Sequence, residues 1–118
     1  MKISNEHKNL YNKLDLTIKS ILLISEGWLV GGSIKELMEG KTPKDFDIVV
    51  PDPLLWMKLI SYGSGLSKIK PNSYGGIKFW INGIEYDTWS ETLDHFLINS
   101  KDSEYIYNFK RNLLYKLI

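Results

Sequence analysis

Apolar residues recur at helical spacing near the start of the chain. Between residues 5 and 25 the intervening positions are mostly polar, and the recurring apolar residues are Leu10, Leu14, Ile18, Ile21 and Leu22. Steps of three and four residues place such side chains on one face of a helix. The pattern predicts an amphipathic helix over residues 5–25.

The next segment alternates short apolar runs with turn residues. Residues 28–30 and 45–50 predict two strands. Between them, Gly31 and Gly32 predict a tight turn, Ser33 is the expected N-cap of a short helix, and Gly40 closes that helix. Pro51 ends the second strand, and a further helix is expected from residue 52 to about residue 62.

The second half of the chain predicts a hairpin followed by helices. Residues 76–81 and 84–89 flank Asn82 and Gly83, the dipeptide typical of a two-residue hairpin turn. A short strand is expected near residues 66–69. From residue 90 onward the pattern turns helical, with a final helix over residues 103–117 whose apolar face carries Ile106, Phe109, Leu113 and Leu117.

These elements predict a small α+β fold in which flanking helices cover a mixed β-sheet. The chain has 118 residues, so residues 1–118 are expected to form a single domain. The net charge is +1, which gives no sign of a strongly basic nucleic-acid surface or a polybasic membrane anchor. Cysteine is absent, which excludes disulfides, thiolate metal sites and cysteine nucleophiles. The apolar run at residues 21–24 is too short to span a membrane, so a cytoplasmic protein without a membrane partner is expected.

Two acidic residues in the second strand are the first candidates for chemistry. Asp45 and Asp47 are two residues apart, so their side chains share one face of the strand, with Cα atoms about 6.5 Å apart. Without a cation this arrangement is unfavourable, because Asp is depleted in strands and like charges on one face repel. The pair therefore indicates a cation site.

A third carboxylate is available in the hairpin. Glu85 and Asp87 share a face of the second hairpin strand, and Asp87 is preferred because Glu85 lies close to the turn. If that strand lies beside residues 45–50, Asp45, Asp47 and Asp87 form a set of hard oxygen ligands. Such a set suits Mg²⁺, or Mn²⁺, together with phosphate oxygens.

The glycine turn supplies the features that a triphosphate needs. Gly31 and Gly32 let the backbone approach closely, and the following helix presents free N–H groups. Ser33 adds a hydroxyl group and Lys35 a cation. Alone, either the glycine turn or the Asp pair is weak evidence for such a site. Their combination in this order is a much more specific signal.

These residues resemble the nucleotidyltransferase superfamily with the DNA polymerase β-like fold. The stretch from Leu29 to Gly40, ending in residues 45–50, is most similar to the head domain of poly(A) polymerases and tRNA CCA-adding enzymes. It also resembles minimal nucleotidyltransferases. The resemblance covers residues 28–89 and identifies the chain as a minimal single-domain member. Lys35 and Glu36 stand where the CCA-type pattern has an Arg-Asp pair.

The resemblance implies an enzyme that transfers a nucleoside monophosphate from an NTP to an acceptor hydroxyl, releasing pyrophosphate. It implies that Asp45 and Asp47 hold metal ions, that Asp87 helps to bind the catalytic metal and draws the proton from the hydroxyl, and that the glycine turn holds the triphosphate. The acceptor stays open between a small molecule, an RNA 3′ end and a protein. The alternative is a non-catalytic, antitoxin-like module that keeps the fold and binds a nucleotide or a partner; a degenerate member would be expected to lose one carboxylate.

Other residues carry weaker hypotheses. Of the four tryptophans, Trp80 and Trp89 are the two worth testing for base stacking, since they lie near the predicted carboxylate strand. Gly76, with its preceding glycine, is expected to form a turn or bulge rather than a second phosphate loop. The apolar C-terminal residues are expected to pack within the chain or against a protein partner or second copy.

Overall fold

The computed structural model describes residues 5–51, 53–58, 60, 68–72, 76–90 and 105–116. In these ranges the elements are, in order, α1 (Asn5–Lys13), α2 (Leu16–Ser25), β1 (Trp28–Val30), α3 (Gly32–Met38), β2 (Asp45–Val50), α4 (Pro53–Lys58), β3 (Ile69–Pro71), β4 (Ile77–Ile81), β5 (Ile84–Ser90), β6 (Tyr105–Asn108) and β7 (Leu113–Lys116). No helix in this described part of the chain is long and apolar enough to cross a membrane.

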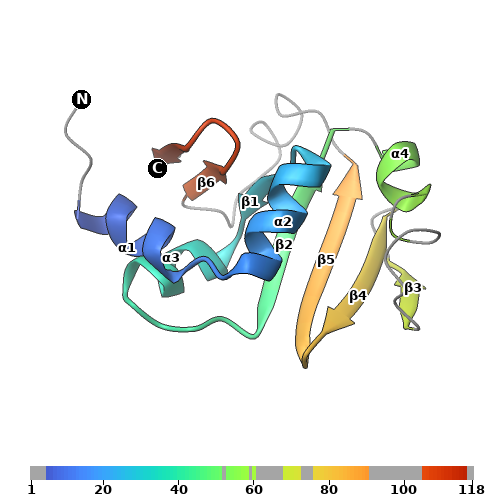
Figure 1. Cartoon of the computed structure of the whole chain (residues 1–118), viewed down its shortest axis with the longest axis horizontal. Coiled ribbons are helices and arrows are strands. Elements are labelled where there is room, and N and C mark those ends of the chain that lie inside the picture. Colours follow the sequence, from blue (N-terminus) through green and yellow to red (C-terminus); the bar gives the residue numbers. More distant parts are fainter. Residues whose placement is uncertain are drawn as a thin grey trace.

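The strands form one mixed sheet in the order β3-β4-β5-β2-β1-β6-β7. β2 and β5 are parallel, and the other neighbours are antiparallel. In Figure 1, α2 lies in front of β1 and β2, and β5 and β4 continue the sheet toward α4. The expected α+β class with a mixed sheet and flanking helices is confirmed.

The main core lies between the helices and one face of the sheet. It joins apolar residues from all four helices to the sheet residues Leu29, Phe46, Ile48, Val50, Ile77, Phe79, Tyr86 and Tyr107. A hydrogen bond of 3.0 Å from Trp56 Nε1 to Thr88 Oγ1 joins α4 to β5. A second, small cluster of Val30, Val49 and Ile106 lies apart from this core. Because side chains alternate along a strand, these residues belong to the opposite face.

The N-terminal segment is two helices rather than the single helix predicted over residues 5–25. The break occurs at Asp15, whose backbone is extended and whose Oδ1 accepts a hydrogen bond of 2.9 Å from Ile18 N. An Asp side chain stabilises a helix N-terminus in this way, so it favours a new start over continuation. The apolar spacing survives the break, since Leu10, Leu14 and Ile18 are all buried.

The start of α3 also differs by two residues from the prediction. Gly31, not Ser33, is the N-cap, with φ of +80°, and the helix begins at Gly32. Glycine adopts this φ readily, so the chain turns earlier than a serine cap would require. The strands at residues 28–30 and 45–50 and the hairpin around Asn82 and Gly83 are confirmed, and β3 lies slightly later than expected.

The predicted final helix over residues 103–117 is wrong. Its described part is a hairpin, β6–β7, and β6 pairs with β1. Asn108 Oδ1 accepts from Arg111 N at 2.9 Å, and Asn112 has φ of +51°, so two asparagines form the turn. The aromatic and β-branched run at residues 105–107 favours a strand, and the helical spacing of its apolar residues was coincidental. The helical prediction for residues 91–104 lies outside the described residues.

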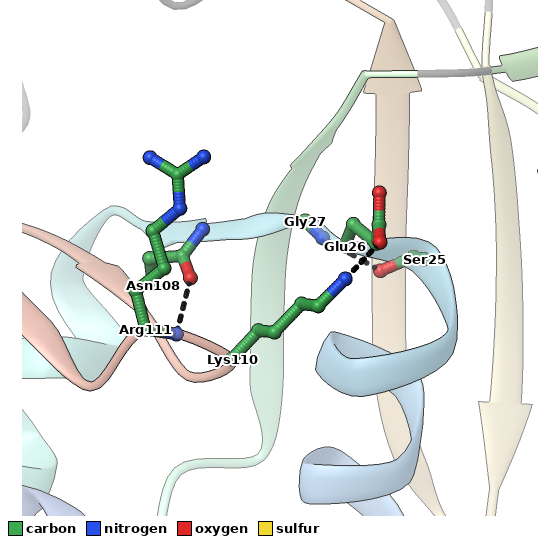
Figure 2. A network of polar contacts seen from close by, with 6 residues as sticks. All are labelled: Ser25, Glu26, Gly27, Asn108, Lys110 and Arg111. Atoms are coloured by element: carbon green, nitrogen blue, oxygen red, sulfur yellow. Dashed lines mark hydrogen bonds and ion pairs between the residues drawn. The ribbon is translucent and has the colours of Figure 1, made fainter.

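A polar contact links this hairpin to the connection between α2 and β1. Figure 2 shows Lys110 from the β6–β7 turn reaching Glu26, while Gly27 N donates to Ser25 Oγ. The hydrogen bond from Lys110, followed by its charge, lowers the pKa of the Glu26 carboxyl. The contact stabilises a surface turn just before β1. The candidate site lies at the other end of β1, next to Gly31.

Candidate active site

Four acidic residues lie on β2 and β5, which run side by side. The parallel register pairs Asp45 with Glu85 and Asp47 with Asp87. Phe46, the residue between the two aspartates of β2, is buried in the main core. The four acidic residues therefore share the sheet face opposite the helices, which we call the carboxylate face.

The electrostatics of Asp47 reflect this crowding. Its pKa is raised to about 6, first by burial and then by the charges of Asp87, Asp45 and Glu85, against which Lys78 acts weakly. Burial and neighbouring negative charge both disfavour the ionised carboxylate. The ionised site thus has an excess of negative charge that a cation would neutralise.

The glycine turn lies directly against Asp47. A Cβ added at Gly31 would lie 2.9 Å from Asp47 Oδ2, so the backbone passes close to this carboxylate. A Cβ added at Gly32 would meet nothing within 4 Å. Ser33 is buried, and its Oγ has no hydrogen-bond partner in the described residues. Lys35 is exposed on α3.

Asn72 is the residue that the sequence did not indicate. Its Nδ2 donates to Asp87 Oδ1 at 2.6 Å and to Thr88 O at 3.0 Å, and its Oδ1 accepts from Gly76 N at 2.8 Å. The single side chain therefore connects the end of β3, the start of β4 and the carboxylate of β5. No sequence pattern identifies this role, because it depends on how β3 and β5 are placed across β4.

The carboxylate face fits a hard divalent cation by its chemistry. In the side-chain positions of the described residues, no group of three or more His, Cys, Asp or Glu converges closely enough to hold a metal ion. The donors are nevertheless carboxylate oxygens on two adjacent strands, and after burial the charges of the neighbouring carboxylates are the next largest causes of the raised pKa of Asp47. Oxygen donors of this kind suit Mg²⁺ or Mn²⁺.

Of the comparisons with known proteins, the one with solved structures bears on the fold. No protein-family model and no curated protein matches the chain. Among solved structures, it is similar to a CCA-adding enzyme with CTP (20% identity, TM-score 0.57) and with ATP (21%, 0.59), each over 80% of this chain. It is also similar to the Thermotoga maritima CCA-adding enzyme complexed with tRNA, at 20% identity and a TM-score of 0.51 over 76% of this chain.

The structural likeness defines the class of fold, which is that of the nucleotidyltransferases. The chain matches only 25–26% of the length of these enzymes, so the likeness concerns one part of them. It shows that this chain shares its fold with that part of them, in agreement with the fold that the resemblance in residues 28–89 implies.

Substituting Gly31 tests whether the turn positions Asp47. We expect Gly31→Ala to lower the free energy of unfolding by about 1–2 kcal/mol, because Ala rarely adopts φ of +80°, and to displace the Asp47 carboxylate. Gly40→Ala is the matched control, since Gly40 has φ of +78° but nothing within 4 Å of an added Cβ. Urea unfolding should show similar losses of stability for both variants. If the site catalyses nucleotidyl transfer, only Gly31→Ala should reduce it. Equal transfer by the two variants would contradict the positioning role.

Proposed function

We propose that this protein is a metal-dependent nucleotidyltransferase that moves a nucleoside monophosphate from an NTP to an acceptor hydroxyl. The observation that carries the proposal is the in-register placement of Asp47 and Asp87 on adjacent parallel strands, directly beside the Gly31 turn. The likeness to CCA-adding enzymes with bound CTP and ATP supports an NTP as substrate.

Each part of the site has a role in this proposal. Asp45, Asp47 and Asp87 would hold Mg²⁺ or Mn²⁺, which when bound neutralises charge on the phosphate oxygens. The backbone at Gly31 and Gly32 lets the triphosphate approach. Ser33 Oγ, buried without a partner in the described residues, is available to donate to a phosphate oxygen. Lys35 adds positive charge from the exposed surface of α3.

The reaction needs positioning and proton transfer more than a protein nucleophile. The acceptor oxygen forms a bond to the α-phosphorus, the bond from that phosphorus to the bridging oxygen breaks, and pyrophosphate leaves with the electron pair. The hydroxyl proton goes to the carboxylate of Asp87. Asn72 donates to Asp87 Oδ1 and so holds the orientation of this carboxylate.

Transfer of label from an NTP tests the proposal. Wild-type protein is incubated with each α-labelled NTP, Mg²⁺ and either an RNA oligonucleotide or a fractionated cell extract. We expect label to enter an acceptor with wild type and with Glu26→Gln, which removes an exposed carboxylate paired with Lys110 away from the site. Asp87→Asn should lose transfer by roughly 10²–10³-fold, since it removes a positioned charge and the proton acceptor.

The same experiment separates the alternative function. A protein that binds NTP tightly but labels no acceptor under any condition would be a non-catalytic binding module with this fold. Undiminished transfer by Asp87→Asn would remove that residue from the mechanism.

A further inference from the structure

Three lysines and a tryptophan lie on the carboxylate face beyond β5: Lys78 and Trp80 on β4, Lys70 on β3, and Lys68 just before β3. Lys70 of β3 pairs in register with Lys78 of β4, and Lys78 pairs with Asp87. One row across the sheet therefore runs Asp47, Asp87, Lys78, Lys70. In the neighbouring row, Trp80 of β4 pairs with Glu85. Figure 1 shows the four strands β2, β5, β4 and β3 side by side.

Two ammonium groups lie close to the indole ring. Lys68 Nζ lies 5.0 Å and Lys70 Nζ 5.8 Å from the centroid of the Trp80 ring. Both lysines are exposed, and Trp80 is half-buried. We call Lys68, Lys70, Lys78 and Trp80 the Lys–Trp surface. It presents an aromatic ring with two ammonium groups beside it and a third lysine paired in register with Lys70.

The charges of this surface are only partly balanced by the protein. Lys78 lies 3.7 Å from Glu85, whereas Lys68 and Lys70 have no ion pair in the described residues. Like charges placed directly opposite each other across two strands are destabilising, and Lys70 and Lys78 are so placed. A ligand with regularly spaced negative charges would relieve that repulsion.

The position of the surface relative to the carboxylates indicates which substrate it serves. The Gly31 turn approaches Asp47 from the β1 side, and the Lys–Trp surface flanks Asp87 from the β4 side. In phosphoryl transfer the attacking and leaving oxygens lie roughly in line on opposite sides of the phosphorus. If pyrophosphate leaves on the side of the glycine turn, the acceptor enters from the side of the lysines.

We propose that the Lys–Trp surface binds a single-stranded nucleic acid and delivers its 3′ hydroxyl to Asp87. The proposal rests on the proposed function and extends it to the acceptor. The lysines contact backbone phosphates and Trp80 stacks on a base, the combination by which proteins hold single strands. A cationic small-molecule acceptor would be repelled by the same three ammonium groups.

Binding measurements test this surface without depending on catalysis. The probe is a fluorescein-labelled single-stranded 12-nucleotide RNA, followed by anisotropy in Mg²⁺ buffer over a range of KCl concentrations. For Lys68→Ala/Lys70→Ala, the slope of log K against log salt should become shallower by about 0.7 per lysine removed. Trp80→Ala should weaken binding by about tenfold with little change in slope, and Trp80→Phe should recover part of the loss.

The control is a lysine over an aromatic ring elsewhere in the fold. Lys19 Nζ lies 5.0 Å from the centroid of Tyr11, on the helical layer, so Lys19→Ala removes the same kind of contact. It should bind the RNA like wild type. A single-stranded DNA of the same sequence and an RNA duplex are further arms; we expect the DNA to bind and the duplex to bind more weakly.

The outcomes separate the two proposals. RNA binding that depends on the Lys–Trp surface, without any nucleotidyl transfer, would support the surface and overturn the proposed function. Transfer to a small molecule or a protein, with no binding of single-stranded RNA or DNA, would support the proposed function. It would contradict nucleic-acid binding by the Lys–Trp surface. If Lys19→Ala and the double variant weakened RNA binding equally, this would also contradict binding by the Lys–Trp surface, because the affinity would then depend on net charge alone.

Discussion

Replacing Asp47 with Asn is expected to raise the stability of the metal-free protein at neutral pH and to remove most of the proposed nucleotidyl transfer. The pKa of Asp47 is raised to about 6 by burial and by the neighbouring carboxylates. The ionised side chain therefore destabilises the folded state, and Asn removes that penalty. Loss of a positioned charge should lower nucleotidyl transfer by roughly 10²–10³-fold.

The pH dependence of this stability gain has a definite sign. Between about pH 4 and pH 6 the folded protein keeps a proton on Asp47 that the unfolded chain has lost, so the stability of wild type falls as pH rises. The advantage of Asp47→Asn should be near zero at pH 4 and reach its full value above pH 6. One pKa unit corresponds to about 1.4 kcal/mol, and with partial solvation we expect about 1–2 kcal/mol in total.

Urea unfolding of wild type, Asp47→Asn and Asp45→Asn at pH 4 and pH 7, without divalent cations, measures the effect. Asp45 is exposed, so its variant controls for loss of one charge from the same strand and should gain less. Addition of Mg²⁺ should then narrow the gap between wild type and Asp47→Asn by stabilising wild type. A gap that does not change with pH would contradict the assigned environment of Asp47.

Gly76→Ala is expected to lower the free energy of unfolding by about 3 kcal/mol or more. A Cβ at this position would lie 1.8 Å from Thr88 O and 2.6 Å from Trp89 Cα, both backbone atoms of β5. Such a clash requires the strands to separate, and overpacking of this kind is strongly destabilising. The change would also disturb Asn72, which accepts from Gly76 N and donates to Asp87.

Chemical denaturation of Gly76→Ala beside Gly32→Ala measures this prediction. An added Cβ at Gly32 meets nothing within 4 Å, so that variant should change stability by less than about 1 kcal/mol. A Gly76→Ala protein within 1 kcal/mol of wild type would mean that β4 and β5 approach less closely than the structure has them. The close approach of β4 and β5 also explains why a glycine stands at position 76, without a phosphate ligand.

Local patterns in the sequence predicted the elements that depend on few neighbours. The strand at residues 45–50 and the hairpin at Asn82 and Gly83 follow from alternation and turn chemistry, and both are present. The break at Asp15 and the β6–β7 hairpin were missed for a shared reason. In each, an Asp or Asn side chain bonds to a nearby backbone N–H and overrides the apolar period.

The geometry of the candidate site depends on contacts that no local pattern encodes. The choice of Asp87 required β5 to lie beside β2, about forty residues away in sequence, with the two aspartates in register. Asn72 and the row of lysines on β3 and β4 depend in turn on that order of strands. The residue types could be read from the sequence, whereas their alignment across the sheet required the fold.

Binding of Mn²⁺ tests most directly whether the acidic groups of β2 and β5 form a divalent-metal site. Mn²⁺ is titrated into wild type, Asp47→Asn and Glu26→Gln in the presence of a non-hydrolysable NTP analogue, and the bound ion is followed by its paramagnetic resonance. We predict saturable binding to wild type and to Glu26→Gln, and at least about tenfold weaker binding to Asp47→Asn. Equal binding by all three proteins, or no saturable binding by wild type, would contradict the account.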